Sequence, residues 1–595
     1  MASLAEKRHT LAHLLAKAVL ERHPNALLTL GPAVDDGFYY DIDFGAEKIS
    51  DADLPELEKA MRKHLPGWKE FSREEVSPDE ARTRFANNPY KLELVNEIAA
   101  RGEPVTLYTA GSTAQSSKLQ APSSSFTDLC RGGHAKHPAA DIAPDSFALD
   151  RIAGAYWRGD EAKPMLTRIY GLAFDTKEEL DAYRAQREEA KKRDHRKLGA
   201  ELDLFVISEL VGAGLPLFTP KGTLLRDLIS DFLWELNKAK GYEKVDIPHL
   251  AKPDLYKVSG HYDKYKDDGF QVHGRDKHFM LKPMNCPHHT QIYASRARSY
   301  RDLPIRYFDI TKVYRDEQSG ELMGLSRVLS ITQDDGHVFC RPDQIGEEVA
   351  RVVSIIKDFY SAVGLLKEGS YRARLSVRDP GTPEKYLGDP AVWDVAEKRL
   401  EEIGKEHGLA LTRGEGEAAF YGPKLDFMFK DAIGREWQLA TIQLDFVQPE
   451  RFQLEYTDDT GSKARPVMIH RAISGSLERF LSVMIEHYAG AFPLWLSPEQ
   501  VRVLPVSEKH AAYAAEVAAA LMAADIRAEA DDANESLGKK IRAGKQDKVP
   551  YLLVVGDKEA GAKTVTAESR DHGKLEGLPL AALIERLAKE ISERA

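Results

Sequence analysis

Cysteine is scarce in this chain of 595 residues, and long apolar runs are missing. Its three cysteines, Cys130, Cys286 and Cys340, lie far apart and are odd in number, so they indicate no disulfide framework. No run of about 18 apolar residues offers a membrane-spanning helix. The first residues also lack the apolar core and cleavage site of a signal peptide. These absences predict a protein of the reducing cytoplasm that does not enter a membrane.

Charge and nucleotide motifs narrow the function further. The formal net charge of −11 argues against nucleic-acid binding over the whole surface, but it leaves room for a local basic surface. No Walker-type GxxxxGKS or GxxxxGKT loop occurs, so a P-loop nucleotide site is excluded. At roughly 150 residues per domain, the length predicts about four domains.

Local patterns divide the chain into parts. Residues 1–175 mix a helical start, a short strand at 37–44 and a charged helical region, with a polar loop at 113–125. A charge-dense helical pattern at 176–200 predicts a connecting helix. Its Lys- and Arg-rich end suits a solvated helix face, and phosphate contact is the alternative. No internal repeat of fixed period is found.

The largest part, residues 201–495, combines long helices with several strands. Apolar residues at helical spacing from Leu225 to Leu236 predict a buried helix face, which Gly241 ends. A strand is expected in "EKVDIPHL", from Glu243 to near Pro248, and others at "KLDFMFKD", "EWQLATIQLDF" and "PVMIH". Because strands and helices do not alternate regularly, we expect an α+β domain on a mainly antiparallel sheet. Residues 496–595 do alternate strand and helix, which predicts a parallel α/β domain.

One cysteine and two histidines in this large part suggest a metal site. Cys286 lies in "KPMNCPHH", His337 in "TQDDGHVFC" and His470 where a strand meets a helix. These residue types are good zinc ligands, and three protein ligands would leave one position open for substrate. A lone histidine is more often a satisfied core residue. His288, His289 and Cys340 are competing ligands.

Ordered arginines suggest a phosphate site in the same part. Arg315 and Glu317 alternate along a probable strand, so they face the same side. Arg327 follows on the next strand, and Ser476 and Arg479 share one face of a helix. Guanidinium groups bind phosphate oxygens bidentately, so three of them suit a triphosphate. Surface salt bridges are the alternative.

These motifs carry a family resemblance. "YRDE", "GLSR", "TQDDGHVFC" and "MIHRAISGSLERF" resemble motifs 2 and 3 of class II aminoacyl-tRNA synthetases. Together with "PMNCP", "PEKYLG", "AFYGPKLDF" and "TIQLDF", they resemble the threonyl-tRNA synthetase family over nearly the whole chain. The resemblance implies a multidomain α+β fold. It comprises an α+β editing domain (1–175), a basic connecting helix (176–200), a class II antiparallel-sheet catalytic core (201–495) and a C-terminal α/β anticodon-binding domain (496–595). The chain starts at the editing domain, without the small N-terminal domain of many relatives.

The same resemblance implies roles in an ATP-dependent reaction that passes through threonyl-adenylate to threonyl-tRNA. One Zn²⁺ per subunit would be held by Cys286, His337 and His470 and would receive the amino and hydroxyl groups of L-threonine. Asp335 would accept a hydrogen bond from that hydroxyl group. Arg315 would bind the α-phosphate of ATP, Glu317 would lie near the base, and Arg327 and Arg479 would hold the pyrophosphate end with Mg²⁺. The remaining substrate-binding residues would be Gln333, Tyr421, Lys424, Gln438, Gln443 and Ser476.

Such a site predicts a need for editing. Valine lacks the hydroxyl group and would leave buried polar groups unpaired, whereas serine lacks only a methyl group, worth about 1–3 kcal/mol. Serine should therefore be attached in error. "HTLAH" and "DLCRGGH" resemble the HxxxH and CxxxH motifs of an editing domain, whose site would comprise His9, His13, Cys130, His134, Asp128, Lys91 and Tyr40. Whether this site holds a metal is open.

The resemblance also names partners. The C-terminal domain would read the anticodon of tRNA(Thr), with Asn534, Glu535 and Arg570 as candidates beside the basic residues Lys539, Lys540 and Arg542. A homodimer is implied, with residues 222–250 as its interface.

A few positions depart from the family pattern. Ile331 replaces an aromatic residue that stacks on adenine, which predicts weakened ATP binding because such stacking is worth about 1–3 kcal/mol. His288 replaces a glycine, and Glu568 replaces a basic anticodon contact. Two alternatives stay open: another class II synthetase, which would not need the Cys/His/His set, and a non-enzymatic tRNA-binding paralogue.

Overall fold

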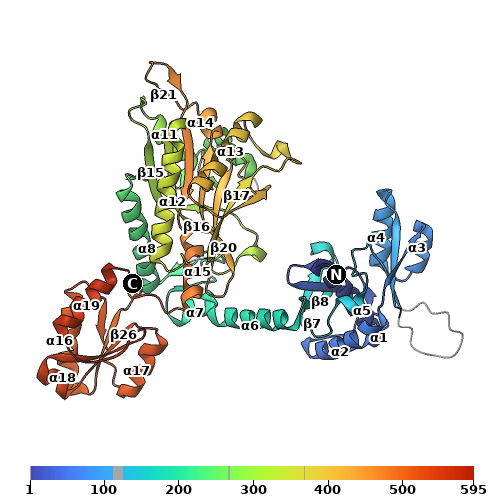
Figure 1. The fold of residues 1–595 in the computed structure, drawn as a ribbon, viewed down its shortest axis with the longest axis horizontal. Helices are drawn as coiled ribbons and strands as arrows, with labels where there is room; N and C mark the ends of the chain where they lie inside the picture. The colour runs from blue at the N-terminus through green and yellow to red at the C-terminus, as the bar shows by residue number, and fades with distance from the viewer. Residues whose placement is uncertain (1, 112–124, 266–267, 368, 595) are drawn as a thin grey trace. The chain divides into compact units, whose positions relative to one another are not determined.

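The computed structural model describes residues 2–111, 125–265, 268–367 and 369–594 (Figure 1). The loop predicted at 113–125 lies, except for Ser125, outside these residues. The chain forms two compact units, Met1–Glu188 and Glu189–Ala595. Among the described residues, no helix combines the length and the apolar character that crossing a membrane would take.

The first unit packs a long helix against an antiparallel sheet. Helix α1 starts with a capping box, in which Ser3 and Glu6 satisfy each other's backbone N–H groups. Its apolar face, with Leu11 and Leu15, is fully buried against β3 and its neighbours. One sheet has the order β1-β3-β8-β7, with β2 on β3, and a second has the order β4-β5-β6. The elements are α1 (Leu4–Arg22), β1 (Leu27–Leu28), β2 (Ala33–Val34), β3 (Gly37–Asp43), α2 (Leu54–His64), β4 (Phe71–Val76), α3 (Pro78–Arg84), α4 (Pro89–Ala100), β5 (Val105–Ala110), β6 (Phe126–Leu129), α5 (Pro138–Asp141), β7 (Phe147–Tyr156) and β8 (Met165–Ala173).

The predicted connecting helix is two helices. Helix α6 covers Lys177–Arg193, and α7 covers His195–Glu201. Asp194 separates them, because its carboxylate accepts a hydrogen bond from the backbone N–H of Arg196 at 2.8 Å and so begins a new helix. The sequence showed the helical charge pattern but not this break.

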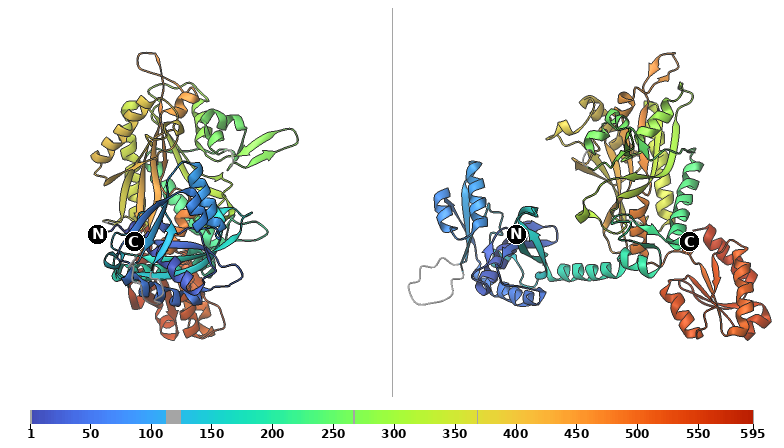
Figure 2. Two further views of the ribbon diagram at one scale, coloured as in Figure 1. Left: turned by 90° about the vertical axis from the view of Figure 1, so that its right-hand side faces the viewer. Right: turned by 180° about the vertical axis from the view of Figure 1, so that it is seen from behind.

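The second unit is built on an eight-stranded sheet with the order β11-β15-β16-β23-β20-β19-β17-β18. All neighbouring pairs are antiparallel except β11 with β15 and β17 with β18, so the expected mainly antiparallel core is confirmed. Helices α8 and α12 lie beside each other on one face (Figure 2). The strands of the sheet are β11 (Glu243–Lys244), β15 (Ile305–Tyr314), β16 (Ser330–Cys340), β17 (Tyr371–Val377), β18 (Leu411–Glu415), β19 (Lys424–Lys430), β20 (Glu436–Asp445) and β23 (Val467–Ala472).

Helices and small hairpins complete this core. They are β9 (Phe205–Val206), β10 (Leu217–Phe218), α8 (Pro220–Ala239), β12 (Leu250–Ala251), α9 (Pro253–Ser259), α10 (His261–Lys264), β13 (Gln271–His273), β14 (His278–Leu281), α11 (Cys286–Ala294), α12 (Ile345–Ala362), α13 (Pro390–Glu406), α14 (Val447–Arg451), β21 (Tyr456–Thr457), β22 (Lys463–Ala464) and α15 (Leu477–Tyr488). The strand predicted from Glu243 to near Pro248 is wrong in extent, since only Glu243–Lys244 pairs, as β11, and the next strand, β12, begins at Leu250. Pro248 lies between them and has no N–H to donate.

The C-terminal hundred residues form an α/β sheet with the order β25-β24-β26-β27-β28. Helices α16 and α17 pack against opposite faces through separate apolar clusters (Figure 1). The prediction of parallel strands holds for β24, β25 and β26, but β27 and β28 are antiparallel because a tight turn at Gly573, with φ +74°, joins them. The elements are β24 (Val501–Pro505), α16 (Ala511–Met522), β25 (Ala528–Ala530), α17 (Leu537–Gln546), β26 (Tyr551–Val555), α18 (Asp557–Ala562), β27 (Thr564–Ser569), β28 (Gly573–Pro579) and α19 (Leu580–Ser592).

Candidate functional site

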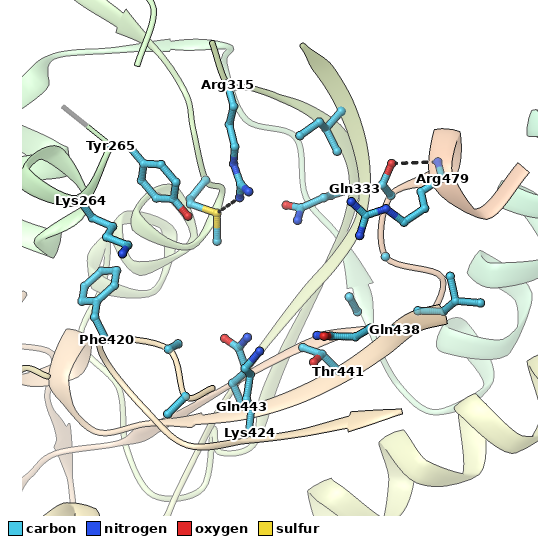
Figure 3. Close-up of a pocket in the computed structure, with 18 of the residues that line it drawn as sticks. Lys264, Tyr265, Arg315, Gln333, Phe420, Lys424, Gln438, Thr441, Gln443 and Arg479 are labelled. Atoms are coloured by element: carbon cyan, nitrogen blue, oxygen red, sulfur yellow. Dashed lines mark hydrogen bonds between the residues drawn. The ribbon is translucent and has the colours of Figure 1, made fainter. Parts of the chain in front are cut away.

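A cavity of about 550 Å³ opens on the central sheet of the second unit (Figure 3). Every residue that the sequence predicted to bind ATP or the amino acid lines this cavity, except Asp335. These residues are Arg315, Glu317, Arg327, Gln333, Tyr421, Lys424, Gln438, Gln443, Ser476 and Arg479. Most come from the loop between β15 and β16, from β16, β19 and β20 and from the start of α15, while Tyr421 lies just before β19. Arg315, Glu317 and Arg327 were expected on strands, which is wrong: β15 ends at Tyr314 and β16 begins at Ser330, so all three lie in the loop between them.

Three guanidinium groups make one end of the cavity electropositive. The guanidinium of Arg315 lies 5.0 Å from the centre of the Tyr265 ring, and its Nη2 lies 3.0 Å from the sulfur of Met284. Arg479 donates its Nε–H to the carbonyl oxygen of Ser326 at 3.1 Å (Figure 3). Burial and the charges of Arg327 and Arg315 lower the pKa of Arg479. An anion bound between these groups would relieve that repulsion.

Arg327 has carboxylate partners at this end. Its guanidinium is 2.5 Å from an oxygen of Glu317 and 3.0 Å from one of Glu321. The side chain of Arg327 is 43% exposed, so it can exchange these partners for phosphate oxygens at small cost.

The opposite wall is organised by a carboxylate that the sequence analysis missed. Asp426 on β19 is fully buried and accepts hydrogen bonds from Ser376 at 2.7 Å and from Gln438 at 2.8 Å. The ammonium group of Lys424 lies 3.0 Å from the same carboxylate. Asp426 therefore fixes Lys424 and Gln438 at the cavity wall. The available signal was the alternation in "KLDF", which places Lys424 and Asp426 on one face of a strand.

The three predicted metal ligands lie close together beside strands β16 and β23. Cys286 begins α11, and His337 and His470 are direct partners on β16 and β23. One ligand atom of each residue lies within 4.8 Å of the others, and all three side chains are buried. Gln443 pairs with His470 on the other side, so the group adjoins the cavity.

Neighbouring groups fix which imidazole nitrogens are free. Nδ1 of His337 is hydrogen-bonded to His289 at 2.8 Å, and Nε2 of His470 to Asp445 at 2.8 Å. The remaining atoms, Nε2 of His337 and Nδ1 of His470, point at each other. Burial, followed by the nearby His470, lowers the pKa of His337 well below its usual value, so this imidazole is neutral. Neutral imidazoles oriented by a second hydrogen bond are typical of zinc ligands.

The three residues that could compete as metal ligands, His288, His289 and Cys340, have other surroundings. His289 bonds His337 and so supports a ligand, while Cys340 packs in the main apolar core. His288 is mostly buried, and neither of its ring nitrogens has a hydrogen-bond partner among the described residues. The thiol of Cys286 has a pKa raised well above its usual value by burial, so a thiolate there calls for an adjacent cation. The donor set and its supporting hydrogen bonds fit zinc.

Two residues beside the ligands were also missed by the sequence analysis. Asn285 donates its amide to Asp335 at 3.0 Å, which orients a carboxylate that is 3.7 Å from His337. Nε2 of His261 lies 3.6 Å from the sulfur of Cys286. Asn285 stands next to Cys286 in the "PMNCP" motif but was given no role, whereas His261 belonged to no recognised pattern and only the fold brings it to the ligands.

Asp334 explains the second carboxylate of the "QDDGH" segment. It points to the other face of β16 and forms an ion pair with Arg471 at 2.6 Å, in which both side chains are fully buried. Asp334 also accepts hydrogen bonds from the backbone N–H groups of Ile473 and Ser474 at 2.7 and 2.9 Å. This carboxylate therefore holds the start of the segment that carries Ser476 and Arg479.

The histidine pairs of the first unit also converge. Nε2 of His9 and Nε2 of His134 each lie 3.4 Å from the sulfur of Cys130, and His13 completes a group whose ligand atoms are within 4.8 Å. A cavity of about 340 Å³ lies beside them, lined by His9, His13, Tyr40, Lys91, Asp128 and Cys130 among others. His134 does not line this cavity, because it stacks on Phe71 with ring centres 4.1 Å apart.

Asp128 is the charged centre of this group. It forms a buried ion pair with Lys91 at 2.6 Å and accepts a hydrogen bond from the hydroxyl group of Tyr40 at 2.5 Å. Burial lowers the pKa of His134 to about 2 and raises the pKa of Cys130 to about 11. At neutral pH both groups are uncharged, so the cavity offers uncharged nitrogen and sulfur atoms beside one carboxylate–ammonium pair.

The candidates in the C-terminal domain have differing surroundings. Asn534 and Glu535 are exposed just before α17, and Glu535 forms an ion pair with Lys539 at 2.8 Å. Arg570 donates hydrogen bonds to the backbone of Lys548 and Phe492 as well as to its neighbour Asp571. Its guanidinium is therefore already engaged in holding loops together.

Lys540 and Glu568 of this domain both interact within it. Lys540 is 6% exposed and donates to the carbonyl of Asp531 at 2.8 Å, so its expected place among the basic contacts is wrong. Glu568 forms an ion pair with Lys545 at 2.6 Å. Both interactions stay within the domain.

Comparison with known proteins gives consistent matches. Residues 270–488 match the family model of the tRNA synthetase class II core domain (G, H, P, S and T), and residues 500–590 match the anticodon binding domain. The threonine–tRNA ligase of Thermus thermophilus is 48% identical over 600 residues, covering 99% of this chain and 88% of its own length. That of Gloeobacter violaceus is 48% identical, covering 98% of this chain and 92% of its own length. The RNA binding domain of threonyl-tRNA synthetase from Cryptosporidium parvum superposes with a TM-score of 0.63 at 38% identity, covering 67% of this chain and 98% of that structure.

Proposed function

This chain belongs to the threonine–tRNA ligase family, and we propose that it activates L-threonine with ATP and transfers it to tRNA(Thr). One observation carries the proposal: a buried Cys/His/His group adjoins a cavity lined by three arginines. Tyr421 joins the two, because its ring stacks on His470 with centres 4.9 Å apart and its hydroxyl group donates to Gln443 at 2.7 Å. A thiol–imidazole group beside a polyphosphate-sized basic cavity suits an enzyme that activates a small polar amino acid.

For the first step, the arginines hold the phosphates of ATP, and Glu317 lies near its base. Arg315 binds the α-phosphate, while Arg327 and Arg479 bind the pyrophosphate end together with Mg²⁺. Lys424 and Gln438, fixed by Asp426, are placed for polar groups of the nucleotide. The chain supplies position and positive charge, so the carboxylate of threonine can attack the α-phosphate without a covalent enzyme intermediate.

For threonine, we propose that Cys286, His337 and His470 hold one zinc ion. When bound there, zinc would offer coordination positions for the amino and hydroxyl groups of the amino acid. Asp335, held by Asn285, accepts a hydrogen bond from the hydroxyl group of threonine, and Gln333, Tyr421 and Gln443 enclose the amino acid. Valine leaves the Asp335 carboxylate without that partner, which penalises valine strongly, whereas serine satisfies it.

The first unit hydrolyses the resulting seryl-tRNA. The cavity beside His9, His13 and Cys130 receives the ester, and the Lys91–Asp128–Tyr40 group orients the substrate and its attacking water. The uncharged imidazoles act as acceptors for protons of the water or of the ribose hydroxyl groups. This editing role is supported by geometry: four side chains of the types that can bind a metal ion lie together, with a carboxylate, beside one cavity.

We place the contacts with tRNA and with a second subunit on the surface of the second unit. The C-terminal domain binds the anticodon through the exposed residues just before α17, around Asn534. The chain forms a homodimer through 222–250 and the preceding hairpin loop, where Leu210 is fully exposed and Ile207 is 47% exposed. The free thiols of Cys130 and Cys286 suit the reducing cytoplasm.

Amino-acid-dependent ATP–pyrophosphate exchange tests the proposal. With all twenty amino acids offered separately, we expect strong exchange with threonine, weak exchange with serine and none with valine. Exchange with a different amino acid would overturn the zinc assignment. Failure with every amino acid in a folded, zinc-loaded sample would favour a non-enzymatic tRNA-binding protein.

A further inference from the structure

A buried histidine outside the cavity connects α7 to the loop between β15 and β16, which carries Arg315 and Arg327. His195, the first residue of α7, is 3% exposed. Its Nδ1 lies 2.7 Å from a carboxylate oxygen of Glu486 on α15, and its backbone N–H donates to the same oxygen at 3.1 Å. Its Nε2 lies 3.0 Å from the backbone nitrogen of Leu325. The ring therefore bridges α15 and the loop that precedes β16.

Asp194, His195 and Glu486 together have the residue types of a metal site, but their atoms are already engaged. The guanidinium of Arg196 contacts Asp194 at 2.6 Å, and that of Arg435 contacts Glu486. Both nitrogens of the His195 ring have partners. The group therefore acts as a hydrogen-bonded support rather than as a ligand set.

The partners determine the tautomer of His195. A backbone N–H can only donate, so Nε2 must accept from Leu325 and carry no proton. The proton is then on Nδ1 and is donated to Glu486. Burial alone would raise the pKa of Glu486, but hydrogen bonds from His195 and the charge of Arg435 hold it below its usual value. The carboxylate is therefore anionic and a strong acceptor.

The turn that His195 holds leads directly to the arginines. Gly324 has φ +52°, and a Cβ there would lie 2.2 Å from Nε2 of His195, so the ring and the turn are in close contact. Ser326 follows; its carbonyl accepts from Arg479 at 3.1 Å, and its hydroxyl group is 2.9 Å from that of Ser482. Arg327 is the next residue.

We propose that His195 is a positioning residue for ATP: it anchors the Gly324–Ser326 turn to α15 so that Arg327 and Arg479 face the triphosphate together. The inference rests on the proposed function, because it assigns those arginines to ATP. Its consequence is selective. Loss of the Leu325 contact weakens ATP binding, whereas the threonine site, built from Cys286, His337 and His470, is unaffected.

Two substitutions of His195 test its two side-chain hydrogen bonds separately. In His195→Asn the amide can reproduce the Nδ1 donor to Glu486, but nothing reaches Leu325. In His195→Gln the longer side chain can place its oxygen near the Nε2 position and accept from Leu325. Both variants change the same residue, so a general loss of packing should affect them alike. His487→Asn, which alters the next residue after Glu486, serves as the matched control.

The measurement is ATP–pyrophosphate exchange with ATP and threonine varied separately, together with thermal unfolding. We expect His195→Asn to raise the KM for ATP about tenfold while the KM for threonine stays within about twofold, and His195→Gln to restore most of the loss. Gly324→Ala, which pushes the turn off the ring, should reproduce the ATP defect. Equal ATP defects in the Asn and Gln variants, parallel changes in both KM values, or an unchanged KM for ATP in His195→Asn would overturn the proposal. A wild-type protein without threonine-dependent exchange would instead refute the proposed function.

Discussion

His337 on β16 and His470 on β23 are direct partners across the central sheet, with Nε2 of one 3.1 Å from Nδ1 of the other. Their other nitrogens are bonded to His289 and Asp445. Two imidazoles are thus oriented with their free nitrogens converging near the sulfur of Cys286. The first prediction tests the proposal that these three atoms share a zinc ion.

Removing the thiol should remove the metal and with it the choice of amino acid. We expect Cys286→Ala to lose its stoichiometric zinc and to reduce threonine-dependent exchange by at least about a hundredfold, because a ligand and its charge are lost. Zinc content by atomic emission and exchange with threonine measure this. Cys340→Ala is the control, since Cys340 is a core residue; equal zinc loss in both would speak against the assignment.

Restoring an aromatic ring at Ile331 should strengthen ATP binding. Ile331 lines the same cavity as the three arginines, and an aromatic ring in its place could stack on adenine. Because such stacking is worth about 1–3 kcal/mol, Ile331→Phe should lower the KM for ATP at least about fivefold. Ile331→Leu keeps the apolar character without the ring and should change little. An unchanged or higher KM for ATP in the Phe variant would disprove the stacking explanation.

The first unit should be separable from threonine activation. Asp128→Asn removes the charge that pairs with Lys91, and the buried ammonium left behind should disturb the cavity. We expect hydrolysis of seryl-tRNA(Thr) to fall at least about tenfold, with serine accumulating on the tRNA, while ATP–pyrophosphate exchange with threonine is unchanged. Glu103→Gln, on an exposed ion pair with Arg131, is the control. If hydrolysis survives in the Asn variant, editing does not depend on this group.

Acid should destabilise the first unit through its buried histidines. Burial lowers the pKa of His134 to about 2, against about 6.5 in the unfolded chain, so only the unfolded chain takes up a proton as the pH falls below about 6.5. Stability is unaffected well above that pH and is lost below it, by about 1.4 kcal/mol at pH 5.5 for one such histidine. His134→Phe, which can still stack on Phe71, should lose less. Native-state hydrogen exchange of α1 amides at pH 7.5 and 5.5 measures the difference, and equal losses in both proteins would exclude His134 as the cause.

Two substitutions in the C-terminal domain should separate a loss of tRNA recognition from a loss of folding stability. Asn534→Ala changes an exposed residue, so we expect reduced charging of tRNA(Thr), about tenfold in kcat/KM, with normal exchange and normal unfolding temperature. Lys540→Ala removes a buried contact to Asp531 and should instead lower the unfolding temperature. Normal charging in Asn534→Ala would remove this residue from the anticodon surface.

Some features of the site could be read from sequence because they are local. The alternation of residues along "TQDDGHVFC" set which side chains share a strand face, and Ser476 to Arg479 share a helical turn. Likewise, the spacing of His9 and His13 on a helix follows from 3.6 residues per turn. Periodicity gives the direction of a side chain within its own element. It does not give the neighbour that the side chain meets.

The mainly antiparallel core, the α/β end of the chain and, through its motifs, the family could all be predicted from residue patterns alone. The tertiary structure decided the rest. It paired β16 with β23 so that His337 meets His470, buried Lys540 instead of exposing it, and placed Asp426 beneath Lys424. It also broke the connecting helix at Asp194 and brought His195 against Leu325, 130 residues away. Hydrogen bonds between distant segments depend on sheet order and register, which arise from packing of the whole core rather than from any one segment.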